Sequence, residues 1–106
     1  MISIDEFKRI ELRIGKIEKV EEIVGSKNLY KLTVDFGNEK RQIISGIKKY
    51  YKPEDIEGKQ FVFVTNLEHA KIMGEVSEGM ILAAVNDKDV ILIKPEKEIP
   101  NGSRIS

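Results

Sequence analysis

The strongest constraint on the fold is a pair of adjacent segments with strand-like alternation. One face of LYKLTVDF, residues 29–36, collects four apolar side chains: Tyr30, Leu32, Val34 and Phe36. Lys31 and Thr33 point the other way, toward solvent or a ligand. The Gly-Asn pair that follows predicts a hairpin turn into a second strand, KRQIISGI. The register of that strand stays open, because Ile43 and Ile44 are both apolar.

Further strand signals lie on both sides of this hairpin. A strand in ELRIGKIEKVEEI changes its apolar phase at Gly15, which predicts a bulge and a sharp bend. QFVFVTNL and GMILAAV are nearly continuous apolar strands, and DVILIKP adds one more. The stretch between the first two of these, EHAKIMGEVSE, is expected to be an irregular loop.

Two short helical turns complete the pattern. SIDEF starts with Ser3 and has Glu6 three residues later, the spacing of a capping box. YYKPEDIEGK has Pro53 near its start and Gly58 near its end. A helix between the third and fourth of five strands is the order of an OB-fold barrel. We therefore predict an all-β, five-stranded OB-fold with short helices and an added C-terminal strand.

The length of 106 residues predicts a single domain, residues 1–106. The absence of cysteine excludes disulfides, thiolate metal sites and a cysteine nucleophile. The first ten residues are too charged for a signal peptide, and no apolar run approaches the roughly 18 residues of a membrane span. We expect a cytoplasmic protein with no membrane partner.

Charge is balanced overall but uneven along the chain. The stretch KRQIISGIKKYYK, residues 40–52, holds five cations and no acidic residue, whereas residues 53–80 hold six acidic residues and two lysines. Charge alone favours ordinary solvated lysines. The basic stretch begins, however, on the second and third strands, which form the ligand face of an OB-fold. This position favours a surface for a polyanion.

The common catalytic motifs are missing from the chain. It contains no G-x-G-x-x-G, G-x-x-x-x-G-K-[ST], H-E-x-x-H or G-x-S-x-G. His69 is the only histidine, so a multi-histidine zinc site is excluded. We expect no catalytic residue, no metal and no cofactor.

Aromatic residues and methionines leave alternatives open. Tyr50 and Tyr51 follow two lysines, and they could stack on bases or pack the helical turn onto the barrel. Met73 and Met80 suit either an adaptable contact surface or the core.

Four segments resemble a known family in order and spacing: ELRIGKI, GSKNLYKLTVDFG, RQIISGIKKYYKPEDIEGK and NLEHAKIMGEVSEGMILAA. They are similar to the tRNA-binding domain at the C-terminus of many methionyl-tRNA synthetases. The same domain occurs in free-standing tRNA-binding proteins and in the endothelial-monocyte-activating polypeptide group. Several members have Pro-Arg where this chain has His69-Ala70, so this loop carries one cation fewer.

The resemblance implies a homodimeric OB-fold that holds tRNA by its shape and backbone. Its partner would be a methionyl-tRNA synthetase catalytic domain, in cis or in trans. The motif residues expected to bind tRNA fall on Asn28, Lys31, Arg41, Ser45, Asn66, Lys71, Ser77 and Met80. The aminoacylation signatures H-I-G-H and K-M-S-K-S do not occur, so we expect no aminoacylation by this chain.

Two other interpretations remain open. A bacterial export-associated chaperone shares the expected fold, and its end resembles PEKEIPNGSRI. The domain could also serve mainly to dimerise a larger enzyme. For Arg41, the alternative to a phosphate contact is an ion pair with a neighbour such as Asp35 across the hairpin.

Overall fold

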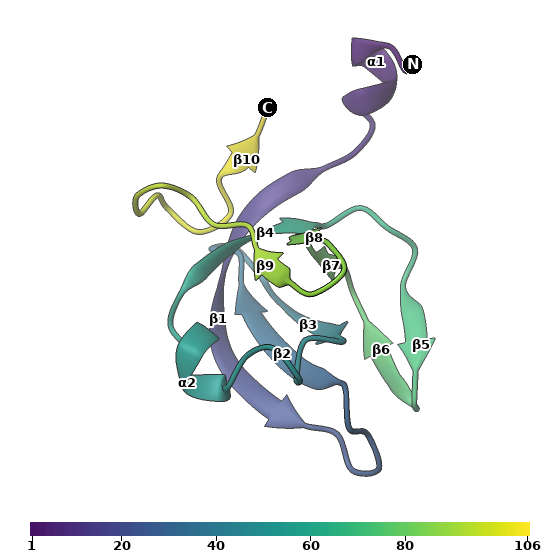
Figure 1. The fold of residues 1–106 in the computed structure, drawn as a ribbon. Helices are drawn as coiled ribbons and strands as arrows, with labels where there is room; N and C mark the ends of the chain where they lie inside the picture. The colour runs from purple at the N-terminus through teal and green to yellow at the C-terminus, as the bar shows by residue number, and fades with distance from the viewer.

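The computed structural model describes residues 1–106 and is all-β apart from two four-residue helices (Figure 1). The helices are α1 (Ile4–Phe7) and α2 (Pro53–Ile56). The strands are β1 (Leu12–Glu22), β2 (Tyr30–Asp35), β3 (Lys40–Ser45), β4 (Gln60–Val64), β5 (Ala70–Ile72), β6 (Glu75–Ser77), β7 (Met80–Ile81), β8 (Ala83–Val85), β9 (Val90–Leu92) and β10 (Arg104–Ile105).

The main sheet is antiparallel and curls into a half-barrel in the strand order β3-β2-β1-β4-β7. The long strand β1 makes this possible, because it pairs with β4 along its first half and with β2 along its second half. The helix α2 lies between the third and fourth strands. The predicted OB-like, all-β architecture is therefore confirmed.

Strand β1 bends differently from the expectation. The register shift against β2 lies between Ile17 and Lys19, so the bulge predicted at Gly15 comes a few residues later. Gly15 instead allows the backbone of β1 to pack closely against Val34 and Phe36. A Cβ atom there would lie 2.5 Å from Val34 Cγ1 and 2.7 Å from Phe36 Cε1. The missing side chain lets β1 pass directly over the core face of β2.

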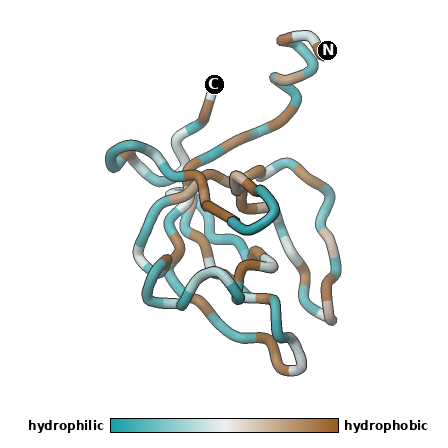
Figure 2. Tube along the Cα trace, viewed as in Figure 1, coloured by the Kyte–Doolittle hydropathy of each residue, from teal (hydrophilic) through white to brown (hydrophobic).

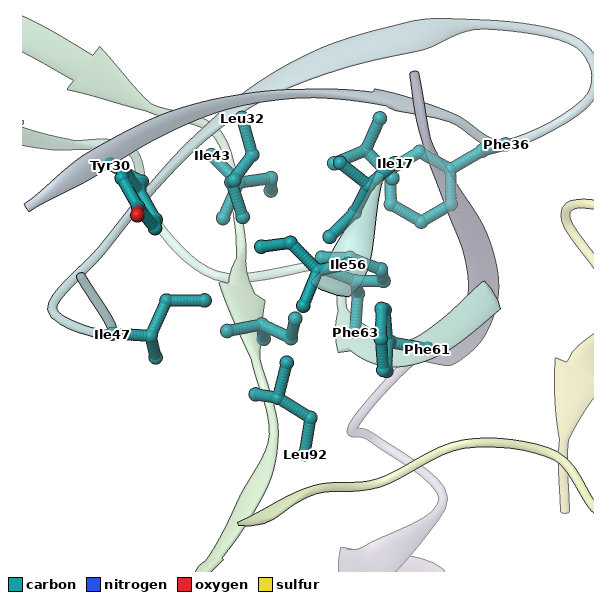
Figure 3. Packing of buried hydrophobic residues seen from close by; sticks show 12 residues of the cluster. Ile17, Tyr30, Leu32, Phe36, Ile43, Ile47, Ile56, Phe61, Phe63 and Leu92 are labelled. Atoms are coloured by element: carbon teal, nitrogen blue, oxygen red, sulfur yellow. The ribbon is translucent and has the colours of Figure 1, made fainter. Parts of the chain in front are cut away.

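The core fills the concave side of the curled sheet (Figure 3). All four apolar residues of the LYKLTVDF face are buried, as predicted. Phe36 packs edge to face against Phe63 of β4, with ring centroids 5.4 Å apart. Ile56 of α2 is fully buried among them and anchors that helix to the barrel.

The β2–β3 hairpin resolves the register that the sequence left open. Leu32 pairs with Ile43 and Val34 pairs with Arg41. Because directly opposed residues share a face of the sheet, Ile43 belongs to the core side. Ile44 faces the other way and is nevertheless buried. The outer side of β3 must therefore be covered by another part of the chain.

Several predicted elements need correction. EHAKIMGEVSE is not irregular, because β5 and β6 form a hairpin around Met73 and Gly74, both with positive φ. The GMILAAV strand is interrupted at Leu82, and the added strand β9 pairs only with β8. The pairing of β10 with β1 was not foreseen. A strand of two residues such as β10 is too short for alternation to reveal.

The capping box predicted for SIDEF is present, with Ser3 and Glu6 exchanging hydrogen bonds. Helix α1 projects from the barrel at the end where β10 also lies (Figure 1). No helix is long and apolar enough to cross a membrane.

Close packing at Gly15 predicts that Gly15→Ala destabilises the protein by about 1–3 kcal/mol, the usual cost of overpacking. The control is Gly46→Ala, because a Cβ atom there would meet only Leu29 Cδ2, at 4.0 Å. Urea unfolding of both variants measures the difference. Equal stabilities would mean that Val34 and Phe36 can move aside at no cost.

Candidate nucleic-acid interface

The outer surface of β2 presents polar side chains between two loops. Lys31 and Thr33 alternate with the buried residues of β2, and Gln42 lies opposite Thr33 on β3. One flanking loop is residues 23–29. The other is the segment 66–77, which contains β5 and β6 and which we call the arm. In Figure 1 the arm extends from the barrel beside β3.

Two contacts hold the arm beside the outer surface of the sheet. The Lys31 ammonium lies 3.4 Å from the Glu75 carboxylate. The Gln42 side-chain amide donates to the Val76 carbonyl at 2.9 Å. The tip of the arm lies near the other loop, since a Cβ atom built on Gly25 would lie 3.8 Å from Met73 Cε. The two loops therefore flank the polar side chains of the sheet.

The arm joins the sheet through hydrogen bonds along the free edge of β3, which we call the seam. The Ile44 amide donates to Ser77 Oγ and the Gln42 amide donates to the Glu78 carboxylate, both at 2.9 Å. The Glu78 amide returns a hydrogen bond to the Gln42 carbonyl at 2.8 Å. These partners are needed because the buried amide of Ile44 cannot reach water. The seam closes the barrel on the side of β3.

Arg41 lies next to Gln42 at the end of the seam. Its Nη1 atom donates to the carbonyl oxygens of Thr65 and Glu78. Its Nε and Nη2 atoms donate to the two carboxylate oxygens of Glu39, at 2.9 and 3.2 Å. This hydrogen bonding lowers the pKa of Glu39 and raises the pKa of Arg41. The alternative to a phosphate contact was an ion pair with a neighbour such as Asp35. The acidic partner is Glu39, whereas Asp35 accepts the Gly37 amide in the hairpin turn.

Other cations of the basic stretch also have acidic partners. Lys40 lies 3.0 Å from Glu18, whose hydrogen bond raises the pKa of Lys40. Lys48 lies 2.7 Å from Glu22. Ion pairs therefore engage three of the five cations of residues 40–52. The charge density of this stretch is lower than its sequence indicates.

The structure gathers only some of the predicted site residues on one surface. Asn28 is exposed in the loop 23–29, Lys31 lies on the outer face of β2, and Lys71 is exposed on β5 of the arm. Ser45 is half-buried at the end of β3, opposite the buried Tyr30. Met80 is exposed at the start of β7, past the base of the arm.

Three other predicted site residues use their polar atoms within the protein. Asn66 accepts the Glu11 amide and donates to the Arg9 carbonyl, which ties the N-terminal segment to the end of β4. Ser77 is buried and belongs to the seam. Arg41 has four acceptor contacts, as described above.

Sequence reasoning missed Gln42 and Glu75, which hold the arm against the sheet. A signal was available in the alternation of AKI and EVS around the turn Met73-Gly74, which is typical of a short hairpin. No group of three or more histidine, cysteine or acidic side chains is placed to hold a metal ion.

Comparison with known proteins places this arrangement in a family. Residues 12–104 match the model of the family described as "Putative tRNA binding domain". The chain belongs to this family. A methionine–tRNA ligase of Archaeoglobus fulgidus is 49% identical over 104 residues, which are 98% of this chain but 16% of the ligase. The chain thus spans about a sixth of the ligases it matches.

Two solved structures superpose over the whole chain. A methionyl-tRNA-synthetase-related protein from Pyrococcus horikoshii has a TM-score of 0.95 and 41% identity, with 98% of its chain covered. The chaperone CsaA from Bacillus anthracis has a TM-score of 0.91 and 36% identity, with 99% of its chain covered. The predicted resemblance is confirmed, and the chaperone shares the fold as expected.

The seam predicts that Ser77→Ala destabilises the protein by about 1–3 kcal/mol, because the buried Ile44 amide loses its acceptor. Ser45→Ala is the matched control, since Ser45 is a serine near the same edge with no side-chain hydrogen bond in the structure. We expect it to change stability by less than about 0.5 kcal/mol. Thermal and urea unfolding measure both. A neutral Ser77→Ala would show that water or another group replaces the hydroxyl.

Proposed function

We propose that this chain is a non-catalytic tRNA-binding module. The observation that carries the proposal is the position of Lys31 on the outer face of β2, between a loop that carries Lys27 and Asn28 and an arm that carries Lys71. This is the ligand face of an OB-fold, and its flanking loops supply cations at separate points. Membership of the tRNA-binding-domain family supports the same function.

The proposed contacts begin with Asn28, Lys31 and Lys71, joined by Lys27 and Lys49. Lys27, Lys49 and Lys71 are exposed and make no ion pair. Lys31 has a partner in Glu75, at the long separation of 3.4 Å, and a phosphate would replace it. The set implied by the resemblance also contains Arg41, Ser45, Asn66, Ser77 and Met80. Asn66 and Ser77 would support the surface through their internal hydrogen bonds.

The chemistry of these side chains favours recognition of shape. Lysine and asparagine suit phosphate and ribose as well as bases, and they define no particular sequence. Unrelated tRNAs should then bind within a few-fold of one another. Single-stranded RNA of equal length should bind less tightly.

The matched ligases suggest the biological setting. We propose that the module adds tRNA affinity to a methionyl-tRNA synthetase catalytic domain, in cis or in trans, in the cytoplasm. The similarity to the whole length of the Pyrococcus horikoshii protein is compatible with action in trans. The chemistry of aminoacylation would belong to the catalytic domain.

The second candidate function is that of a dimeric chaperone, which the similarity to CsaA favours. The two functions differ in their physical driving force. Phosphate binding releases counterions and weakens with salt. Capture of apolar peptides is nearly independent of salt, or strengthens with sulfate.

We expect a plot of log affinity for tRNA against log salt concentration to have a slope of about −3. This value follows from four phosphate contacts by Lys27, Lys31, Lys49 and Lys71, each contributing roughly 0.7–0.9. Lys71→Ala should make the slope shallower by about one unit and lower the affinity for all tRNAs by the same factor. Filter binding between roughly 50 and 200 mM salt resolves this change.

Lys97→Ala is the control for this measurement. Lys97 lines a different hollow with Gly58 and Lys59, away from the arm. Its replacement by alanine removes the same charge as Lys71→Ala. We expect no change in slope from it. A flat slope for the unmodified protein would contradict tRNA binding and favour the chaperone. Strong preference for one isoacceptor would contradict recognition by shape.

We also propose that the chain forms a homodimer through the surface where α1 and β10 project. Apolar residues occur in both terminal segments outside the barrel (Figure 2). Ile4, Phe7, Ile10 and Ile105 line an apolar crevice of about 280 Å³ between these segments. The four-residue helix α1 buries no side chain of its own. A second copy of the chain would supply the missing cover, as the family resemblance implies.

Light scattering at micromolar concentration should give about twice the 12.1 kDa mass of the chain. Phe7→Asp should shift the protein to the monomer, because a carboxylate in the crevice opposes burial. Val24→Asp is the control, since Val24 is an almost fully exposed apolar residue in the loop 23–29. A monomeric unmodified protein would rule out the dimer, and a dimeric Phe7→Asp variant would place its interface elsewhere.

A further inference from the structure

Arg41 lies on a different side of β3 from the proposed contact surface. It pairs with Val34, whose side chain is fully buried, so the Arg41 side chain leaves the strand on the core side. Its guanidinium carbon lies 5.9 Å from the centre of the Phe36 ring, and its side chain is only 19% exposed. Lys31 and Gln42 emerge on the opposite face. Arg41 is therefore poorly placed to meet a phosphate bound there.

The contacts of Arg41 point to the base of the arm. The arm comprises residues 66–77, and Nη1 of Arg41 binds the carbonyl of Thr65 just before it and the carbonyl of Glu78 just after it. One nitrogen atom thus links the two ends of the arm. The rest of the guanidinium is fixed by the Glu39 carboxylate.

We propose that Arg41 is a positioning residue that clamps the arm, and that it does not itself contact tRNA. The proposal rests on the proposed function, because the arm matters through Lys71. By joining Thr65 to Glu78, Arg41 sets the direction in which β5 and β6 leave the barrel. Lys71 is then held near Lys31 before tRNA arrives, and binding does not have to order the arm.

The geometry requires a guanidinium. Its planar fork reaches two carbonyls with one nitrogen and a carboxylate with the other two. A lysine ammonium keeps the charge but lacks this fixed fork. Arg41→Lys therefore separates charge from positioning, which Arg41→Ala does not.

The test combines amide hydrogen exchange of the free protein with tRNA binding. In Arg41→Ala and Arg41→Lys, we expect faster exchange in residues 70–77 and unchanged exchange in β1 and β4, which also verifies folding. Both variants should weaken tRNA binding by about three- to tenfold, the size expected for ordering about one long side chain on binding. Their salt slopes should equal that of the unmodified protein, because the same phosphates are contacted.

A direct phosphate contact by Arg41 gives different results. Arg41→Ala would then make the salt slope shallower by about one unit, Arg41→Lys would restore affinity, and exchange in the arm would stay unchanged. Any of these three outcomes overturns the clamp. If Arg41→Ala does not fold, Arg41→Lys alone decides between the two roles.

Lys40→Ala is the matched control. It removes the neighbouring cation of β3, which pairs with Glu18 and does not touch the arm, so exchange in residues 70–77 should stay unchanged. The exchange measurement is independent of RNA. If the unmodified protein showed no salt-dependent tRNA binding, the proposed function would fail, while faster exchange in both Arg41 variants would still establish the clamp.

Discussion

The free edge of β3 is the constraint on which the rest of this structure depends. Ile43 and Ile44 are both buried, so the amide of Ile44 needs a protein acceptor. Ser77 Oγ accepts that amide. Next to it, the Glu78 carboxylate accepts the Gln42 amide and the Glu78 amide donates to the Gln42 carbonyl, in place of a regular strand pairing. A barrel closed in this way must bring the base of the arm against β3. The direction of the arm is thus a consequence of satisfying buried amides.

The same closure explains how the basic stretch is used. Arg41 and Lys48 are bound by acidic residues and carbonyls of neighbouring segments, which hold the loops in place. Lys49 and Lys52 of this stretch stay exposed and make no ion pair. A neutral protein with exposed lysines retains local attraction for phosphate, while it has little long-range attraction for polyanions in general.

The fold by itself does not decide between tRNA and apolar peptides, since both a chaperone and a synthetase-related protein superpose over the whole chain. The difference must lie in the side chains that emerge between the two loops. Here they are a lysine, a threonine and a glutamine on the sheet, with exposed lysines on both flanking loops. Such a surface offers donors for phosphate and ribose, although the two loops also expose the apolar side chains of Val24, Met73 and Val76.

The sequence by itself determined the succession of the main barrel strands along the chain, the buried face of β2, the hairpin at Gly37 and the capped helix α1, because alternation and turn chemistry are local properties. It also identified the family. Only the tertiary structure decided that Ile43 faces the core, that Gly15 makes room for Val34, and that residues 70–77 form a hairpin. It likewise separated Lys31 on the outer face from Arg41 on the core side. These features depend on pairing between segments distant in the chain, and the hydrogen bonds of one strand edge are settled only when its partner is in place.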